Sequence, residues 1–306
     1  MPQTRAAPAD AFPALAAPAH LPRQARLYID VQHGLCNRLR AMASGAVIAQ
    51  RLGRELVVVW RPDPHCEARL GDLLHYPGPV IEDDVADLLR AQSAQVYNYM
   101  EIEPGARFQE PILATGDVAG DVYIRSAYVL NSPHRDPALE ERFLRRLVPS
   151  APVRDLVSRV RRLCDVAVHI RMASGAGFEH LVHESPDNWP AHRHSEMVEW
   201  RKKSHADHFI ARLDALRAVG GLRTIFLATD LAQTYARLAE RYGADLVCLE
   251  RDLYDRSTLQ IQYALADLIL LARCPRLLAS SWSSFSDMAE RLGPCNVLIE
   301  RSGIDF

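Results

Sequence analysis

The stretch His-Gly-Leu-Cys-Asn-Arg-Leu-Arg at positions 33–40 places polar side chains on the first turns of an expected helix. Gly34 permits a close backbone approach where an expected strand over 26–31 ends, and the free N–H groups of a helix start favour a bound phosphate. Asn37 and Arg38 would add side-chain donors to such a site. The alternative is that Asn37 only caps the helix, as asparagine often does, and that the arginines are solvated.

A second candidate site lies at the end of the apolar run Ala-Val-His-Ile-Arg-Met, residues 167–172. His169 and Arg171 are two residues apart, so they share one face of a strand. The rigid donor fork of Arg171 can hold a diphosphate without losing its proton, and His169 can contact a base, a sugar or a phosphate. The structural alternative is an interdomain salt bridge for Arg171 and a histidine whose hydrogen bonds are satisfied.

Further polar residues end or interrupt apolar segments nearer the C-terminus. Asp230, a further candidate for donor binding, ends an expected strand and begins a helix, where a helix N-cap is the simpler interpretation. Asp267 interrupts an apolar helix and needs a donor there, which guanine with its two adjacent N–H groups or an arginine of the protein could supply. Ser283 and Ser284 can donate to phosphate at a helix start, although Ser284 and Asp287 also resemble a capping box.

These positions fall on alternating strands and helices, which is typical of an α/β protein with parallel sheets. Strands are expected over 26–31, 55–60, 121–126, 165–171, 224–229, 245–250, 276–281 and 296–300. Helices are expected over 36–53, 138–147, 152–163, 205–219, 231–242, 257–273 and 285–292. Residues 61–135 are otherwise punctuated by Pro, Asp and Gly, which obscures their pattern.

Prolines 149 and 152 interrupt the helical pattern and favour a domain junction near residue 150. We therefore predict a flexible leader over 1–25, a first domain over 26–150 and a second domain over 151–306. Two such domains would enclose a cleft, and open parallel sheets bind ligands beyond the carboxyl ends of their strands.

Composition argues against several classes of protein. The chain has 306 residues, of which 48% are hydrophobic and 24% charged, and its formal net charge of −2 is not that of a nucleic-acid-binding protein. Charged residues interrupt the most apolar region, 263–282, so no membrane span is expected. The 6 scattered cysteines lack a zinc-type spacing and are expected to be reduced, and the Ala- and Pro-rich leader lacks the apolar core of an export signal. These features favour the cytoplasm.

Four motifs taken together resemble a known series: GLCNRLRAMAS, HIR, FLATD and ALADLILLARCPRLLASSWSSFSDMAERLG. Their order and spacing over residues 27–293 are similar to those of the fucosyltransferase superfamily with the GT-B fold, which includes nodulation-type and core α1,6-fucosyltransferases and the protein O-fucosyltransferases. The resemblance implies two Rossmann-like domains facing a central cleft, with a GDP-sugar donor, expected to be GDP-fucose, held mainly by the second. It also implies inverting transfer to a carbohydrate or glycosylated acceptor without a required metal or other cofactor.

The resemblance assigns roles to individual residues. It implies that Arg171 neutralises the diphosphate of the donor and that His169 and Asp267 contact the nucleotide. It also implies that Ser283 and Ser284 lie beside the phosphates.

The first domain matches the series with two departures. Asn37 corresponds to the asparagine of a glycine-rich loop that faces the donor, which would make this turn half of a diphosphate clamp. Met172 stands where several relatives have a second basic residue, so Arg38 or Arg40 would have to supply that charge. Cys36 stands where glycine is more usual.

An inverting transfer needs a base for the proton of the attacking hydroxyl and a positive charge beside the leaving diphosphate. Arg171 can provide the charge. The resemblance to the core-fucosyltransferase branch indicates Glu179, ten residues after His169, as the base. Glu184 and Asp187 are alternatives, and all three acids could instead be solvated loop residues.

The segment 172–200 fits no motif of the series, and we expect it to recognise the acceptor. Its histidines have poor spacing for zinc (His180, His183, His192 and His194). The acidic run Glu82-Asp83-Asp84 is the other metal candidate, and we interpret it as a solvated helix start. Two alternative functions stay open, namely transfer from another nucleotide sugar and nucleotide-sugar binding without catalysis.

Overall fold

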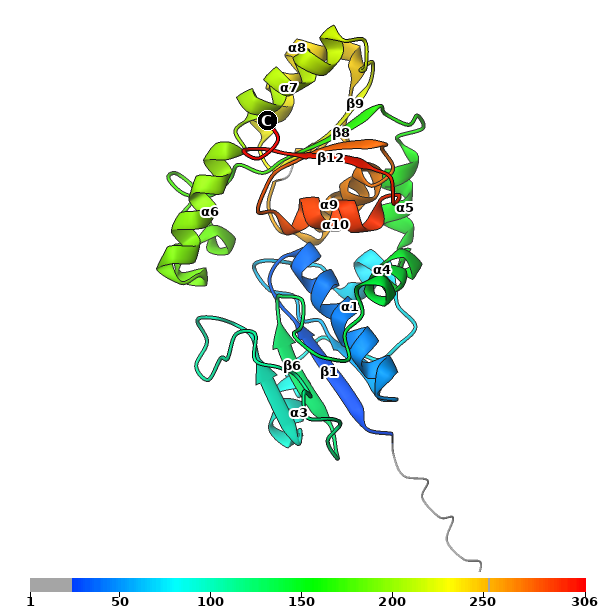
Figure 1. The fold of residues 1–306 in the computed structure, drawn as a ribbon, viewed down its shortest axis with the longest axis vertical. Coiled ribbons are helices and arrows are strands. Elements are labelled where there is room, and N and C mark those ends of the chain that lie inside the picture. Colours follow the sequence, from blue (N-terminus) through cyan, green and yellow to red (C-terminus); the bar gives the residue numbers. More distant parts are fainter. Residues whose placement is uncertain (1–23, 253) are drawn as a thin grey trace, which may run out of the picture.

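Two five-stranded parallel sheets stand one above the other along the long axis of the molecule (Figure 1). The computed structural model describes residues 24–252 and 254–306. Apart from its last two residues, the leader predicted over 1–25 lies outside the described part of the chain.

The first sheet has the strand order β4-β2-β1-β6-β5, and every neighbouring pair is parallel. The strands predicted over 26–31, 55–60 and 121–126 are confirmed as β1, β2 and β6. The short strands β4 and β5 lie in the region whose pattern was obscured. The strands are β1 Arg26–Val31, β2 Glu55–Val59, β4 Val80–Ile81, β5 Gln95–Asn98 and β6 Val122–Ser126.

The second sheet has the order β10-β9-β8-β11-β12, again with parallel neighbours. All five of its strands were predicted, although the strand expected over 245–250 is reduced to two residues. The strands are β8 Val166–Ile170, β9 Ile225–Thr229, β10 Leu246–Val247, β11 Arg276–Ala279 and β12 Leu298–Arg301. A separate two-residue ribbon pairs β3 Leu74–His75 with β7 Val148–Pro149.

The predicted helices are present, although α5 ends at Ser158, five residues before the predicted end at 163. Helix α6 was not predicted, because only Met197 and Arg201 of its 13 residues are buried and it therefore has no apolar stripe. The helices are α1 Leu35–Arg51, α2 Leu70–Leu73, α3 Val85–Gln92, α4 Pro137–Arg146, α5 Ala151–Ser158, α6 Ala191–Lys203, α7 Ala206–Ala218, α8 Ala232–Tyr242, α9 Thr258–Leu271 and α10 Ser284–Leu292.

The largest buried apolar cluster joins the two halves of the molecule. It includes Leu39 of α1, Leu144 of α4, Leu265 of α9 and Met288 of α10. Helices α1 and α4 both pack against α10, where the two sheets approach each other in Figure 1. The core therefore runs across residue 150, and the domain boundary at that residue stays a prediction.

A buried carboxylate stands at this junction. Glu140 of α4 has no exposed side-chain surface, accepts a hydrogen bond from Ser44 Oγ of α1 at 2.8 Å, and pairs with Arg291 of α10 at 3.0 Å. Arg135 contributes a second ion pair at 2.7 Å. The carboxylate is thus bonded to both halves at once.

Strand order reverses at one point in each sheet. From β1 the chain continues to β2 on one side, while β6 lies on the other side, and β8 stands in the same way between β9 and β11. In open parallel sheets the crevice beyond the carboxyl ends at such a reversal is the place where ligands bind. The ends of β1, β6, β8 and β11 are therefore where a site is expected.

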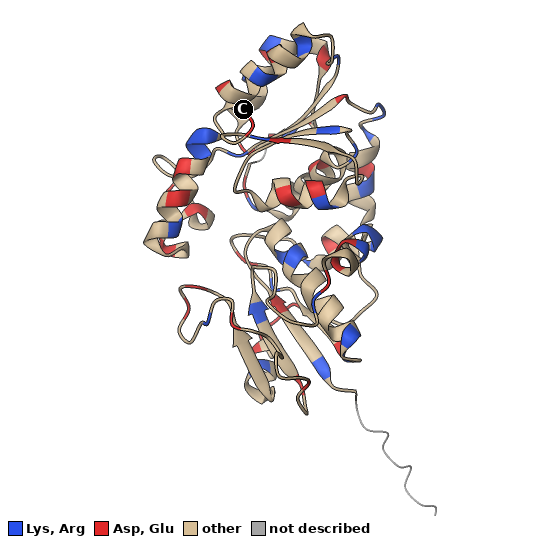
Figure 2. Ribbon diagram, viewed as in Figure 1, with Lys and Arg blue, Asp and Glu red and all other residues tan. Residues whose placement is uncertain are grey.

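Acidic and basic residues are interspersed along the ribbon in both halves (Figure 2). This agrees with the net charge of −2. In the described part of the chain, no helix has both the length and the apolar character needed to cross a membrane.

Candidate functional site

A cavity of about 490 Å³ lies between the two halves and opens on the strand ends where the order reverses. Its lining includes eight residues singled out in the sequence, which lie in β8, in α1, α9 and α10, and in the turns after β1, β8, β9 and β11. They are Gly34, Asn37, His169, Arg171, Asp230, Asp267, Ser283 and Ser284.

The turn after β1 opens the start of α1 toward this cavity. Gly34 is the N-cap of α1 and has no side chain to bond the free N–H groups, and a Cβ at this position would meet no atom within 4 Å. Asn37 lines the cavity and makes no capping hydrogen bond, so the alternative that Asn37 only caps the helix is wrong. The left-handed backbone conformation belongs instead to His33, with a φ of 61°.

Arg38 does not belong to the cavity. Its side chain is fully buried, donates to the carbonyl oxygens of His33 and Arg61 at 2.7 Å each, and pairs with Asp63 at 2.7 Å. The donor-binding role predicted for Arg38 is therefore corrected, because these partners already use the guanidinium. Arg40, the other cation considered, does line the cavity.

Arg171 leaves the end of β8 between two carboxylates. Its Nη1 donates to Asp230 Oδ2 at 2.8 Å, and its Nη2 donates to Glu184. The interdomain salt bridge considered for Arg171 is not formed, because both partners come from the half built on the second sheet. The guanidinium is thus fixed in place at the cavity wall before any ligand binds.

Asp230 is not the helix cap that its position suggested. Leu231 is the N-cap of α8, and Asp230 instead accepts the N–H groups of Met172 and Ala173, at 3.1 Å and 2.8 Å. Burial by itself would raise the pKa of Asp230, but Arg171 and these N–H groups outweigh burial and hold the pKa below its usual range. Asp230 is therefore ionised, and its carboxylate fixes the guanidinium of Arg171 through an ion pair.

His169 stands beside Arg171 as a neutral ring. Its Nδ1 is 2.8 Å from Ser286 Oγ, and the ring stacks on Phe285 with 4.7 Å between centroids. Burial lowers the pKa of His169 to about 3. The ring offers a hydrogen-bonding group and a flat surface without a charge.

The turn after β11 opens the start of α10 toward the same cavity. Ser283 is the N-cap of α10 and its hydroxyl makes no capping hydrogen bond, so the capping box considered for Ser284 and Asp287 is not formed. The preceding Trp282 has a φ of 56°, which is rare for a bulky side chain. Two helix N-termini with unused cap positions therefore face one cavity, which suits an anion.

Asp267 is buried in α9 and has one oxygen paired and one free. Its Oδ2 accepts a hydrogen bond from Arg251 Nη2 at 2.5 Å, whereas Oδ1 has no partner. Burial raises the pKa of Asp267 to about 6, although the charge of Arg251 opposes the shift. The arginine considered as a donor is thus Arg251, which bonds Oδ2. Oδ1 has no partner and can accept a second donor, such as the N–H groups of guanine.

Glu179 is not brought to the cavity. Its side chain is exposed and accepts the N–H of Gly177 at 2.8 Å, within its own turn. Its alternative Asp187 is also exposed, whereas Glu184 is buried and lines the cavity beside Arg171. The loop carries no apolar period that could have predicted which acid turns inward.

The segment 172–200 contributes to the cavity wall through side chains that no motif indicated, and its role in acceptor recognition stays a prediction. These are His183, Glu184, Trp189, Arg193 and Met197. Trp189 stacks on His33 from the other half, with 5.6 Å between ring centroids.

Three further arginines line the cavity without having been predicted to bind. Arg251 and Arg256 follow the strand expected over 245–250, and a strand end is a signal that could have found them. Arg201 of α6 had no such signal. Burial lowers the pKa of Arg201 and Arg256 to about 10 each, and the Nε of each has no hydrogen-bond partner.

Among the residues that the structure describes, no three His, Cys, Asp or Glu side chains form a cluster that could hold a metal ion. The acidic run Glu82-Asp83-Asp84 precedes α3, as interpreted from the sequence. Asp83 accepts the N–H of Val85 at 3.1 Å, and Glu82 accepts that of Leu70 at 2.9 Å.

Comparison with solved structures identifies the architecture. A NodZ alpha-1,6-fucosyltransferase soaked with GDP-fucose aligns over 89% of this chain and 94% of its own, with a TM-score of 0.60 and 20% identity. POFUT1 in complex with GDP-fucose aligns over 94% and 100%, with a TM-score of 0.52 and 13% identity. FUT1 of Arabidopsis thaliana in complex with GDP aligns over 88% and 68%, with a TM-score of 0.52 and 17% identity.

The similarity is one of fold rather than of close sequence. No protein-family profile matches the chain, and no curated protein matches it in sequence. The two parallel sheets, the cavity between them and these structural neighbours together show that the chain has the two-domain GT-B fold found in fucosyltransferases.

Proposed function

We propose that this protein is an inverting, metal-independent glycosyltransferase that transfers fucose from GDP-fucose to a carbohydrate or glycosylated acceptor. One observation carries the proposal. A buried carboxylate with a free oxygen and an anion site at two helix N-termini line the same cavity. The NodZ and POFUT1 structures hold GDP-fucose, and that of FUT1 holds GDP.

The free Oδ1 of Asp267 is suited to a guanine base. Guanine presents two adjacent N–H donors, and leaving a buried carboxylate oxygen unpaired costs about 1–3 kcal/mol or more. A base that donates to this oxygen recovers that cost, and Arg251 holds the carboxylate at the correct angle through Oδ2. We assign Asp267 to the base and His169 to the nucleotide beside it.

The diphosphate is assigned to the anion site. Arg171, the hydroxyls of Ser283 and Ser284 and the start of α1 near Asn37 line the same cavity and can stabilise the charge that develops on the leaving group. Arg256, with its unpartnered Nε, supplies the second cation that Met172 does not. This set of fixed positive groups supports transfer without a divalent metal.

Transfer with inversion requires one displacement at the anomeric carbon, with the acceptor hydroxyl attacking from the side opposite the diphosphate. The cavity supports this geometry, because residues of both sheets' strand ends face it. A cytoplasmic location is part of the proposal, and the free state of all six cysteines is compatible with it.

Donor turnover in the presence of EDTA tests the proposal. We expect the protein to release GDP from GDP-fucose when it is incubated with a panel of labelled oligosaccharides, and to transfer fucose to at least one of them. GDP-mannose and UDP-glucose are the controls and should give much slower release. Turnover that stops in EDTA and returns with Mn²⁺ would contradict metal independence, and binding of GDP-fucose without release would indicate a binding protein.

A further inference from the structure

With Glu179 outside the cavity, the proton acceptor for the transfer has to be sought among the carboxylates that line the cavity. In the described part of the chain these are Glu101, Glu184, Asp230, Asp267 and Asp287. A general base must lie within reach of the attacking hydroxyl and must be free to accept its proton.

Four of these five carboxylates form close ion pairs with arginines, and one of the four also lies beside the proposed diphosphate site. Asp230 and Glu184 both pair with Arg171, and Asp267 pairs with Arg251. Asp287 lies in the first turn of α10, beside the proposed diphosphate site, and pairs with Arg301 at 3.1 Å. A base on that side would face the leaving group rather than the attacking hydroxyl.

Glu101 differs from these four in its origin and its partners. It follows β5 of the first sheet, so it reaches the cavity from the wall opposite Arg171 and α10. Its ion pair with Arg193 of α6 is long, at 3.7 Å between Nε and Oε2, which is beyond hydrogen-bonding distance. Tyr128, two residues after the end of β6, also lines the cavity, and the charge of the nearby Glu101 adds to burial in raising the pKa of Tyr128.

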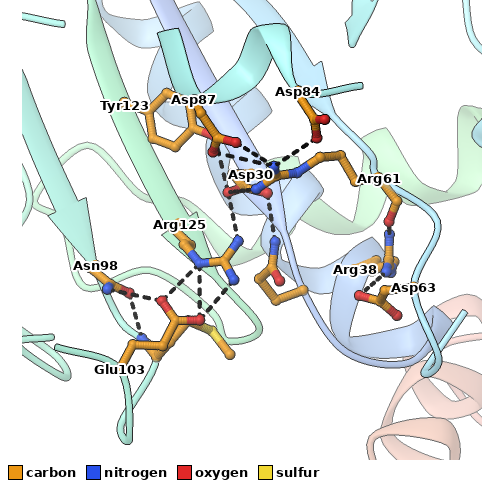
Figure 3. A network of polar contacts seen from close by, with 12 residues as sticks. Asp30, Arg38, Arg61, Asp63, Asp84, Asp87, Asn98, Glu103, Tyr123 and Arg125 are labelled. Carbon is orange, nitrogen blue, oxygen red and sulfur yellow. Dashed lines mark hydrogen bonds and ion pairs between the residues drawn. The ribbon is translucent and has the colours of Figure 1, made fainter. Parts of the chain in front are cut away.

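A partly buried network that includes Asn98 and Glu103 (Figure 3) anchors the chain on both sides of Glu101. Arg125 of β6 donates to Glu103 Oε2 at 2.9 Å and to Asp30 Oδ2 at 2.8 Å, and Asp30 is completely buried at the end of β1. Asn98 donates to Glu103 at 3.1 Å. Because Glu103 is two residues from Glu101, the network fixes the backbone from which Glu101 projects.

The acceptor side of the cavity also has surfaces suited to a sugar ring. The guanidinium of Arg193 lies over the rings of Trp282 and Phe108, at 6.0 Å and 5.8 Å from their centroids, and Trp282 is 37% exposed. An exposed indole beside a charged hydrogen-bonding group can pack against the C–H face of a pyranose and bind its hydroxyls.

We propose that Glu101 is the general base of the transfer and that Tyr128, Arg193 and Trp282 form the acceptor subsite around it. The proposal rests on the glycosyl transfer proposed above. An oxygen of Glu101 takes the proton of the acceptor hydroxyl while that hydroxyl's oxygen forms a bond to the anomeric carbon. The bond from this carbon to the diphosphate oxygen breaks, its electron pair stays on GDP, and the products are the glycoside, GDP and protonated Glu101.

The test compares Glu101→Gln with Glu110→Gln, a control on the same connection whose carboxylate does not line the cavity. GDP release from GDP-fucose is measured with water as the acceptor and with the oligosaccharide panel, and GDP affinity is measured by calorimetry. Glu101→Gln should lower kcat by about 10²- to 10⁴-fold, the range for a lost general base, and leave GDP affinity unchanged. Glu110→Gln should match the wild-type protein in both measurements.

Wild-type kcat in Glu101→Gln would overturn the assignment. A loss of kcat confined to Glu179→Gln would also overturn it and would return the role to the acid indicated by the sequence. Unchanged GDP affinity in Glu101→Gln excludes misfolding as the cause of lost turnover. Failure of the wild-type protein to turn over any donor would instead contradict the proposed function, so the two failures are distinguishable.

Discussion

Asp267 shows how much selectivity one atom can provide. Its Oδ2 is occupied by Arg251, so the choice of base depends on the single oxygen Oδ1. An ionised oxygen accepts N–H donors, whereas a protonated one presents an O–H to the same donors and repels them. Under the proposed function, we therefore expect the protonation state of this one carboxyl group to set the preference among nucleotides.

The preference for GDP over IDP should consequently fall in acid. IDP lacks the exocyclic amino group of guanine and carries the same diphosphate, so titration of the phosphates cancels in the ratio of the two affinities. Because burial raises the pKa of Asp267 to about 6, the carboxyl is ionised above this value and becomes protonated below it. Calorimetry from about pH 8 to about pH 5 should show a preference of roughly 10-fold or more that is progressively lost.

Asp267→Asn is the matched variant for this measurement. The amide cannot ionise, so its GDP-to-IDP ratio should be low and independent of pH. A wild-type ratio that stays constant across the pH range would contradict the role of Asp267.

The structure brings to the cavity those predicted residues that a strand end or a helix period constrained, and their roles stay predictions. Asn37 and Arg38 are adjacent on a helix and so point about 100° apart, which means that both could not face one ligand. Arg38 turned inward and bonds the carbonyl oxygen of Arg61, 23 residues away, and no local pattern reveals such a partner. Glu101, which we propose as the base, had no local signal for the same reason, since the neighbouring Tyr128 and Arg193 come from distant segments.

At the scale of elements, the connection from β5 to β6 acts as a rigid arm rather than as a free loop. Glu103 bonds through both oxygens to Arg125, and Arg125 bonds in turn to buried Asp30. Hydrogen bonds between charged groups that are partly buried contribute about 1.5–3 kcal/mol each. The arm should therefore stabilise the protein and position Glu101 at the same time.

Glu103→Gln tests the arm. The amide keeps the shape but loses the charge that pairs with Arg125, so we expect the free energy of unfolding to fall by about 1–3 kcal/mol. Because Glu101 then has more freedom, kcat should also fall several-fold while GDP affinity stays constant. Denaturant unfolding and the GDP-release assay measure the two effects.

The matched control is again Glu110→Gln. Its carboxylate is 3.7 Å from the exposed Arg107, an ion pair that contributes little. Equal effects of the two substitutions would show that the pairing of Glu103 with Arg125 has no special role.

Elements were predicted from sequence where burial imposed a period and were missed where it did not. The five strands of the second sheet are apolar runs, and all were predicted. Helix α6 and the short strands β4 and β5 hold their places through contacts with distant segments. Arg201 of α6, for example, donates to the carbonyl oxygens of Ser281 and Trp282, and this pairing has no local signature.

At the scale of the whole molecule, the two halves should unfold together. Glu140 bonds to α1 and α10 from a fully buried position, and the apolar cluster around it is continuous. Removing the charge of a buried carboxylate leaves its arginines unpaired, which costs about 3–5 kcal/mol.

Glu140→Gln should therefore lower the free energy of unfolding by roughly that amount in a single cooperative transition. Glu141→Gln, the neighbouring substitution, should change the free energy of unfolding by less than about 1 kcal/mol, because Glu141 is only half-buried and forms a long ion pair with Arg145, at 3.6 Å. Circular dichroism and tryptophan fluorescence should give the same denaturation midpoint. Two separate transitions would contradict joint unfolding, and so would equal effects of the two substitutions.

The overall architecture could be predicted because strands and helices alternate and because the motif series resembles a family with a known fold. The shared core could not be predicted in this way. It depends on how the side chains of α1, α4, α9 and α10 interdigitate, and binary patterns show which face is apolar without showing what covers it.

This shared core also limits how far the two halves can move apart. Opening the cleft by rotating one half would expose buried apolar surface between α1 and α10, unlike the wetter interfaces across which domains usually move. Separating the stacked rings of Trp189 and His33 should cost less free energy than separating the two halves. Such a ring pair contributes only about 0.5–1.5 kcal/mol. The residence time of GDP should accordingly depend on the separation of two rings, and stiffening the rest of the molecule should leave it unchanged.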